Sequence, residues 1–234
     1  MEQILPPGQH QVDRFDRFGT PIYATRLPTA ARAELIVGGH TPETRTLGVA
    51  DLEALRRKSV KADFHCVATW TFRNLHWEGW ALKDVFDAFI APSIRTPQPD
   101  GYIEFHAWDG YRTSLLLTDA LASNVLVADR LDGQPLTLEH GAPLRLVAPD
   151  LYGYKNVKHL SRINLRPDFR AGRAERRTLA HPRGRVAFEE RGRGLPGWVY
   201  RPIYRALIQP TLWYYRHFGR SLPSPDEPSS GARV

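Results

Sequence analysis

The sequence of 234 residues contains a single cysteine, Cys66. One thiol excludes an internal disulfide and any zinc or iron–sulfur site that needs several cysteines. No run of about 18 apolar residues occurs, so the sequence predicts no membrane-spanning helix. The first ten residues have no basic start, no apolar core and no twin arginine. We therefore expect no export signal and a cytoplasmic location.

Positive charge is concentrated in the C-terminal part of the chain. Apolar residues make up 42% and charged residues 24%, which is typical of a globular protein. Residues 170–234 contain 13 Lys and Arg against 5 Asp and Glu, whereas residues 1–169 contain 19 against 20. The net charge of +7 therefore belongs to the tail and says little about what the body binds. We predict a folded body over 1–169 and a basic Arg/Gly-rich extension over 170–234.

The body is predicted to contain many short strands and few helices. Two Asp-Gly pairs, Asp109-Gly110 and Asp132-Gly133, favour tight turns between strands. Strands outnumber helices and do not alternate with them regularly, so we predict an α+β fold with mixed sheets. The apolar spacing predicts helices over 49–55 (with a basic C-terminal end at 56–58) and 81–90, and strands over 33–37, 61–68, 102–108, 111–117, 125–128, 144–147 and 157–165.

The extension has three different parts. Residues 170–196 are rich in Arg and Gly with few apolar side chains, which indicates an extended wrap or linker. Residues 202–218 have helical apolar spacing, and Pro210 should break that amphipathic helix. Residues 221–234 are rich in Pro and Ser and are predicted to be disordered. The helix could pack on the body, contact an anionic membrane through 198–220, or dock a redox partner. No nucleic-acid-binding module is recognisable, so no nucleic-acid partner is expected.

Two segments carry residues able to hold a cofactor. Cys66 lies in a predicted strand followed by Trp77-Glu78-Gly79-Trp80. A lone cysteine is usually a small core residue, but beside a polar pocket it can be a metal thiolate. The second segment combines His140-Gly-Ala-Pro-Leu-Arg145 with Tyr152-Gly-Tyr-Lys-Asn-Val-Lys158. An Arg, a Gly-containing loop and two Lys three residues apart suit a phosphate, although a solvated basic loop would have the same composition.

Taken together and in this order, the segments resemble those of the sulfite oxidase-like molybdopterin-dependent oxidoreductases. That family includes the catalytic subunit of periplasmic methionine sulfoxide reductase. The resemblance extends from Arg17-Phe18-Gly19 through Leu35-Ile-Val-Gly-Gly39 to about Arg166. It implies a sulfite oxidase-like fold, so that 1–169 would be a molybdopterin-binding oxidoreductase domain.

The resemblance also implies a set of site residues. Cys66 would be the catalytic thiolate ligand of molybdenum, with the pterin dithiolene and oxo groups as the remaining ligands. Arg145 and Lys158 would bind the pterin phosphate. The cofactor-binding positions that the family pattern implies are Cys66, Arg17, His140, Arg145, Asn156, Val157 and Lys158, with His140 standing where the reductase has Asn.

The implied activity is oxygen-atom transfer on a small sulfur compound or similar oxo-substrate, with electrons exchanged with an unidentified external donor or acceptor. The pterin and metal carry out the chemistry while the protein orients them. Sulfite oxidases proper have a short Arg-bearing segment after the ligand cysteine. Here Val67-Ala68-Thr69-Trp70 follows instead and Arg73 is the first cation, and this departure from the family pattern argues against sulfite. The alternative is a non-catalytic scaffold whose basic tail binds anionic membrane or nucleic acid.

Overall fold

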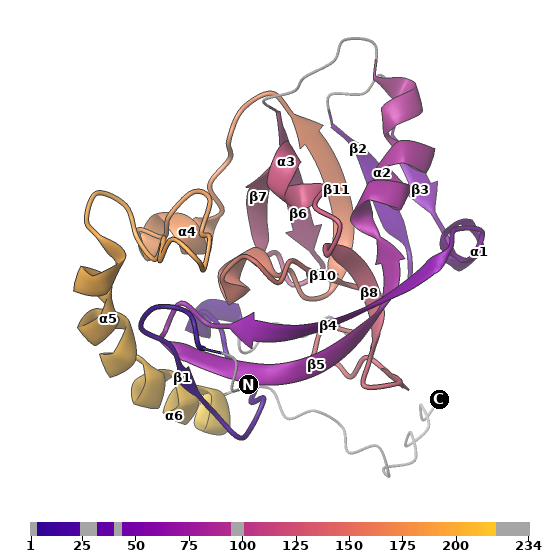
Figure 1. Cartoon of the computed structure of the whole chain (residues 1–234). Helices are drawn as coiled ribbons and strands as arrows, with labels where there is room; N and C mark the ends of the chain where they lie inside the picture. The colour runs from indigo at the N-terminus through magenta and orange to yellow at the C-terminus, as the bar shows by residue number, and fades with distance from the viewer. Residues whose placement is uncertain (1–3, 24–31, 40–43, 95–100, 219–234) are drawn as a thin grey trace, which may run out of the picture.

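The structure, a computed structural model, describes residues 4–23, 32–39, 44–94 and 101–218 (Figure 1). Its strands form two sheets, which confirms the predicted α+β class with mixed sheets. The first sheet contains β1 (His10–Gln11), β4 (Arg57–His65), β5 (Trp70–Ala81), β8 (Leu126–Leu131), β9 (Gln134–Pro135) and β10 (Arg145–Val147). The second has the order β3 (Arg45–Leu47), β2 (Leu35–Gly39), β11 (Leu160–Arg166), β6 (Tyr102–Ala107) and β7 (Arg112–Leu116).

The helices are few and mostly short, as expected. They are α1 (Val49–Glu53), α2 (Leu82–Phe89), α3 (Leu117–Ala120), α4 (Arg173–Arg177), α5 (Gly197–Ala206) and α6 (Ile208–Phe218). Within the described ranges, single turns of 3-10 helix lie at Pro21–Tyr23, Ala91–Ser93 and Gly153–Lys155. No described helix is long and apolar enough to cross a membrane.

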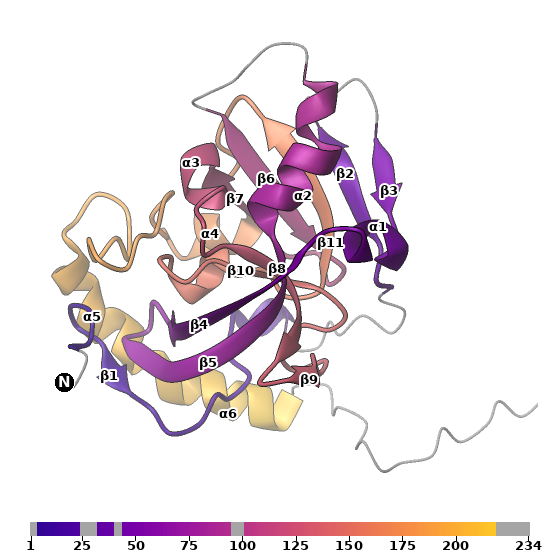
Figure 2. The same ribbon diagram turned by 45° about the vertical axis from the view of Figure 1, so that its right-hand side comes forward.

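The main apolar core lies between the two sheets and α2, which packs over the second sheet in both ribbon views (Figures 1 and 2). Ile103 and Ile163 contribute from the second sheet, Val127 from the first, and Val85 from α2. The predicted helix over 81–90 is α2, and its residues Leu82, Val85 and Phe86, which recur at helical spacing, are buried.

The long hairpin of β4 and β5 organises the first sheet. The two strands run antiparallel, and β8 pairs with the other edge of β5. A side chain at Gly79 would lie 2.1 Å from the Val127 carbonyl oxygen, so glycine permits the close approach of β5 and β8. The basic residues Arg57 and Lys58 were expected to end a helix, but that prediction is wrong because they begin β4.

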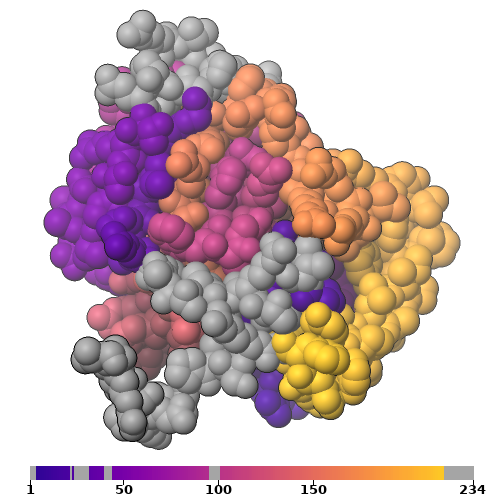
Figure 3. All heavy atoms as spheres, turned by 180° about the vertical axis from the view of Figure 1, so that it is seen from behind, coloured from indigo at the N-terminus to yellow at the C-terminus, as the bar shows by residue number. Residues whose placement is uncertain are grey.

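The extension packs on the body. It was expected to begin with a wrap or linker over 170–196, and the linker interpretation is wrong for the described structure. This segment contains α4, and its Glu175 and Arg191 side chains are buried. In the extension α5 ends at Ala206 and α6 begins at Ile208, so the helix is interrupted at Leu207, three residues before Pro210. Figure 1 shows α5 and α6 beside the N-terminal strand β1, and Figure 3 shows the orange and yellow atoms of the extension along one side of the molecule. The predicted disordered end at 221–234 lies outside the described residues.

Candidate functional site

Cys66 lies in the turn that joins β4 to β5. The predicted strand over 61–68 ends at His65, so the cysteine is the first residue beyond it. Its N–H donates to the Trp70 carbonyl at 2.8 Å, and Thr69, with a positive φ of 74°, donates back to the Cys66 carbonyl at 3.2 Å. The Gln9 side chain donates to the same carbonyl at 3.1 Å. These bonds hold the sulfur in a fixed position at the end of the hairpin.

The surroundings of the Cys66 sulfur are apolar and aromatic. The thiol is 7% exposed and packs in a cluster with Trp70, Tyr200 and Tyr204. Burial raises the pKa of Cys66 to about 12, against the opposing effects of the Ala68 N–H and the Arg191 charge. A thiolate at this position therefore requires a bound cation. Among the described residues, no group of three or more His, Cys, Asp and Glu could hold a metal ion, so further ligands would have to come from a cofactor.

Arg145 and Lys158 lie together behind the loop that precedes β10. The Arg145 side chain is fully buried, and its Nη1 donates to the His140 carbonyl at 2.8 Å. Its Nε and Nη2 have no hydrogen-bond partner. Lys158 Nζ donates to the Glu139 carbonyl at 2.8 Å. Unpartnered guanidinium nitrogens in the interior fit an anion such as a phosphate, which would accept their hydrogen bonds.

The lowered pKa values of Lys158 and Arg145 also indicate a site for an anion. Burial, followed by the charges of Arg145 and Arg17, lowers the pKa of Lys158 to about 7. Burial alone lowers the pKa of Arg145 to about 9. A fully buried Arg145 and a half-buried Lys158 that repel each other would be stabilised by a bound dianion.

The cysteine and the two cations line one cavity of about 230 Å³. Arg17 and Asn156 line it as well. The two ends of the cavity differ in chemistry. At one end the charges of Arg145 and Arg17 help to lower the pKa of Lys158, and at the other end the charge of Arg191 opposes the rise that burial causes in the pKa of Cys66. The residues present therefore fit a group with a metal-binding end and a phosphate end.

The other predicted site residues occupy different places. His140 stacks on Phe15, with ring centroids 4.9 Å apart, and burial together with Lys158 and Arg145 lowers its pKa to about 4. Val157 is buried in the core, and its carbonyl accepts from the Leu146 N–H. Neither side chain is among those that line the cavity. Their cofactor-binding roles stay predictions.

Asn156 and Arg17 contact the cavity while holding neighbouring loops. The Asn156 Oδ1 accepts from the Ala148 N–H at 2.7 Å, so its amide orders the loop between β10 and β11. The Arg17 N–H donates to the Glu139 side chain at 2.8 Å, and its guanidinium lies 5.2 Å from the Tyr215 ring. These contacts tie the N-terminal segment to both the cationic loop and α6.

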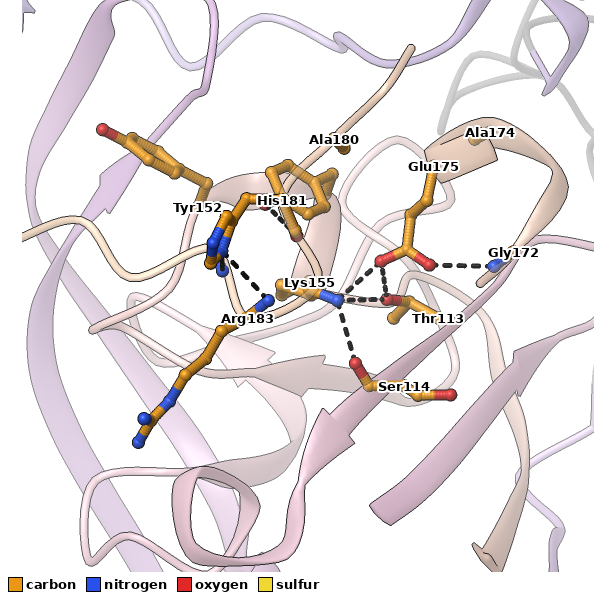
Figure 4. A network of polar contacts seen from close by, with 12 residues as sticks. Thr113, Ser114, Tyr152, Lys155, Gly172, Ala174, Glu175, Ala180, His181 and Arg183 are labelled. Carbon is orange, nitrogen blue, oxygen red and sulfur yellow. Dashed lines mark hydrogen bonds and ion pairs between the residues drawn. The ribbon is translucent and has the colours of Figure 1, made fainter. Parts of the chain in front are cut away.

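Lys155, the first of the two lysines in the segment that suits a phosphate, does not line the cavity. Figure 4 shows its ammonium group directed at Glu175 of α4, with an Nζ–Oε1 distance of 2.6 Å. Thr113 Oγ1 and the Ser114 carbonyl accept its other hydrogen bonds. The expected pair of phosphate-binding lysines is therefore wrong for Lys155, since an acidic partner from the extension neutralises it.

The sequence interpretation missed the contribution of the extension to the cavity. The C-terminal helices line part of the cavity. The residues concerned are Tyr204 of α5, Leu207 between the helices, and Thr211 and Tyr215 of α6. The amphipathic spacing predicted a buried helix face, but it did not show which surface that face would cover. The structure places that face on the cysteine turn and on Arg17.

The fold and the cavity together define a cofactor-dependent oxidoreductase domain. Residues 24–173 match the family described as the oxidoreductase molybdopterin binding domain, and the chain belongs to that family. It is therefore an enzyme of the sulfite oxidase-like class whose cofactor is Mo-molybdopterin.

Relatives support this membership. The chain is 34% identical over 183 residues to the oxidoreductase YuiH of Bacillus subtilis, covering 77% of this chain and 87% of YuiH. It is 28% identical to the protein-methionine-sulfoxide reductase catalytic subunit MsrP of Xanthomonas axonopodis pv. citri, covering 64% of this chain but 51% of MsrP. Human mitochondrial sulfite oxidase is 23% identical and is covered over 29% of its length.

A solved structure shares the fold. The sulfane dehydrogenase SoxCD of Paracoccus pantotrophus superposes with a TM-score of 0.52 at 19% identity, over 69% of this chain and 51% of that chain. This likeness concerns the fold alone. The chain spans about half the length of MsrP and of the SoxCD chain.

Proposed function

We propose that this chain transfers an oxygen atom to or from a small, neutral sulfur compound of the sulfoxide and thioether class, with electrons exchanged with an external partner. The observation that carries the proposal is the single cavity lined by Cys66, Arg145 and Lys158. A soft sulfur ligand at one end and the pair of a buried arginine and a half-buried lysine at the other match the two ends of a metal–pterin phosphate.

Each residue has a defined task in this proposal. Cys66 ligates the metal as a thiolate, and the turn bonds to Trp70 and Thr69 fix its direction. Arg145 and Lys158 bind the phosphate, with the Asn156 and Val157 backbone and His140 alongside, and Arg17 closes the N-terminal side. When bound, Mo-molybdopterin supplies two-electron redox chemistry and oxygen-atom transfer. The surrounding aromatic side chains exclude water from the sulfur end.

The cavity favours a neutral substrate over sulfite. Among the described lining residues the Arg and Lys side chains are Arg17, Arg145 and Lys158, and they gather at the phosphate end. Around Cys66 the lining is aromatic and apolar, with Trp70 and Tyr204. Arg191, the cation beside the cysteine turn, is not among the residues that line the cavity, so an anion such as sulfite would lose its hydration there without a lining cation to replace it. The names of the relatives include a methionine-sulfoxide reductase and sulfite oxidases, and this chemistry supports the former substrate class.

The reaction in the reducing direction is R₂SO + 2 e⁻ + 2 H⁺ → R₂S + H₂O. The electrons come from an external donor, whose identity stays a proposal, as does the cytoplasmic location. Membrane contact through 198–220 also stays a prediction. Tyr200 and Tyr204 of α5 pack on the body, whereas Trp198 and Ile203 of α5 and Trp213 of α6 are exposed.

The test uses protein produced in cells that synthesise the cofactor. We expect about one molybdenum per chain, oxidation of reduced benzyl viologen by dimethyl sulfoxide, and little oxidation of sulfite with ferricyanide. Cys66→Ser should abolish turnover while part of the pterin is retained, because the phosphate site remains intact. Full activity of Cys66→Ser, or sulfite oxidation faster than sulfoxide reduction, would contradict the proposal.

A further inference from the structure

Arg191 connects the extension to the cysteine turn. It lies beyond the family match at 24–173, in the segment before α5, and its side chain is fully buried. Nη1 donates to the Val67 carbonyl at 2.5 Å, and Nη2 donates to the Pro7 carbonyl at 3.0 Å. Nε donates to Glu189 at 3.0 Å. The planar guanidinium thus fastens three segments that are far apart in the sequence.

The Arg191 site has an excess of positive charge. Glu189 also accepts two hydrogen bonds from Arg201, at 2.5 and 2.6 Å. Two guanidinium groups therefore share one carboxylate, and one positive charge is left over. Arg191 is the buried member of the three. A buried charge is screened less by solvent than an exposed one, so its field acts strongly on nearby groups.

The Val67 carbonyl that Arg191 holds belongs to the residue next to Cys66. The turn is thereby fixed from two directions, by Gln9 at the Cys66 carbonyl and by Arg191 at the Val67 carbonyl. Groups that orient a metal ligand and adjust the charge around it tune both the geometry and the redox potential of the metal. Lysine could keep the charge but could not bridge two carbonyls with a planar fork.

We propose that Arg191 is a positioning residue for the molybdenum ligand: it fixes the cysteine turn through Val67 and places a buried positive charge beside the Cys66 sulfur. The inference rests on the proposed function. It assigns the extension a part in tuning the metal centre, whereas the family match ends before the extension's buried arginine.

Three variants separate charge from geometry, each studied as the metal-loaded full chain. Arg191→Met removes the charge and the fork, and should lower the midpoint potential of the bound molybdenum and reduce kcat per molybdenum by about tenfold or more. Arg191→Lys should keep the potential near that of the wild type while kcat falls. Glu189→Gln adds a net positive charge and should raise the potential. In all three the KM for dimethyl sulfoxide should change less than kcat, because substrate contacts remain.

Arg183→Met is the matched control. Arg183 also ties the extension to the body, through hydrogen bonds of 2.6 and 2.7 Å to Asp119 of α3, but neither residue contacts the cysteine turn. We expect its potential and its kcat per molybdenum to equal those of the wild type, even where its thermal stability falls.

Different outcomes would refute the proposed function and the positioning role of Arg191. Wild-type protein without molybdenum would refute the proposed function. Loaded Arg191→Met or Glu189→Gln with wild-type potentials and kcat, or with effects no larger than those of Arg183→Met, would refute the positioning role alone. If Arg191→Met does not fold, the opposite shift expected in Glu189→Gln and the unchanged potential of Arg191→Lys still decide the matter.

Discussion

The buried ion pair between Lys155 and Glu175 gives a direct test of how the extension is held. Both side chains are inaccessible, with exposures of 0% and 1%. The lysine donates to Glu175, Thr113 and the Ser114 carbonyl, while Glu175 Oε2 accepts from the Gly172 N–H at 2.8 Å. The ammonium therefore has a partner for each of its three protons, and removal of the carboxylate would leave a buried charge uncompensated.

The expected loss of stability follows from that geometry. Removing one member of a fully buried pair costs about 3–5 kcal/mol. For a chain of this size, each kcal/mol lowers the midpoint of thermal unfolding by about 2–4 °C. Glu175→Gln and Lys155→Met, measured by calorimetry on cofactor-free protein, should thus each lower the midpoint by about 6–20 °C. The double variant leaves no unpaired charge and should regain more than half of that loss.

Two results would contradict this account of the Lys155–Glu175 pair. If the double variant lost the sum of the two single losses, the side chains would not be coupled as the structure shows. Lys155→Met could instead leave the unfolding midpoint of the cofactor-free protein unchanged, while the same variant produced with cofactor loses the pterin. Lys155 would then be a phosphate ligand. That second result would support the phosphate-binding alternative that the sequence left open beside a solvated basic loop.

Two further predictions concern the cofactor cavity. Because the pKa of Lys158 is lowered to about 7, its ammonium form is lost as pH rises through 7; calorimetric binding of pyrophosphate to cofactor-free protein should weaken by about tenfold between pH 6 and pH 8, and unchanged binding would contradict this. Tyr215→Ala removes the ring that lies against Arg17 and should speed the loss of molybdenum during anaerobic dialysis, whereas Tyr215→Phe should behave like the wild type; equal loss from all three proteins would show that α6 does not retain the cofactor.

Local patterns in the sequence predicted much of the fold. Alternation and helical spacing identified most strands and α2, and both Asp-Gly pairs lie in turns, with positive φ at Gly110, Asp132 and Gly133. Such patterns could not locate Cys66 precisely at a strand end. The turn depends on the left-handed conformation of Thr69 and on the Gln9 side chain, neither of which alternation reveals.

The buried charges of the extension could not be predicted from the sequence. A segment rich in Arg and Gly with few apolar residues is typical of a solvated linker. Here the charged side chains themselves become buried, because Glu175 meets Lys155 and Arg191 meets backbone carbonyls from two distant segments. Burial of a charge is favourable only with its partner in place, and that partner is set by the tertiary fold. The resemblance to the family identified several residues of the cavity. The family match ends at residue 173, however, so it could not include the contacts of Glu175 and Arg191.

The central claim is that the Cys66 sulfur and the pair Arg145 and Lys158 hold one metal–pterin group. X-ray absorption at the molybdenum edge tests it most directly. We predict that wild-type protein contains molybdenum with one more sulfur neighbour than Cys66→Ser, and that Arg145→Met lowers the pterin content without changing the sulfur count of the metal that remains. An identical sulfur shell in wild type and Cys66→Ser would contradict the account.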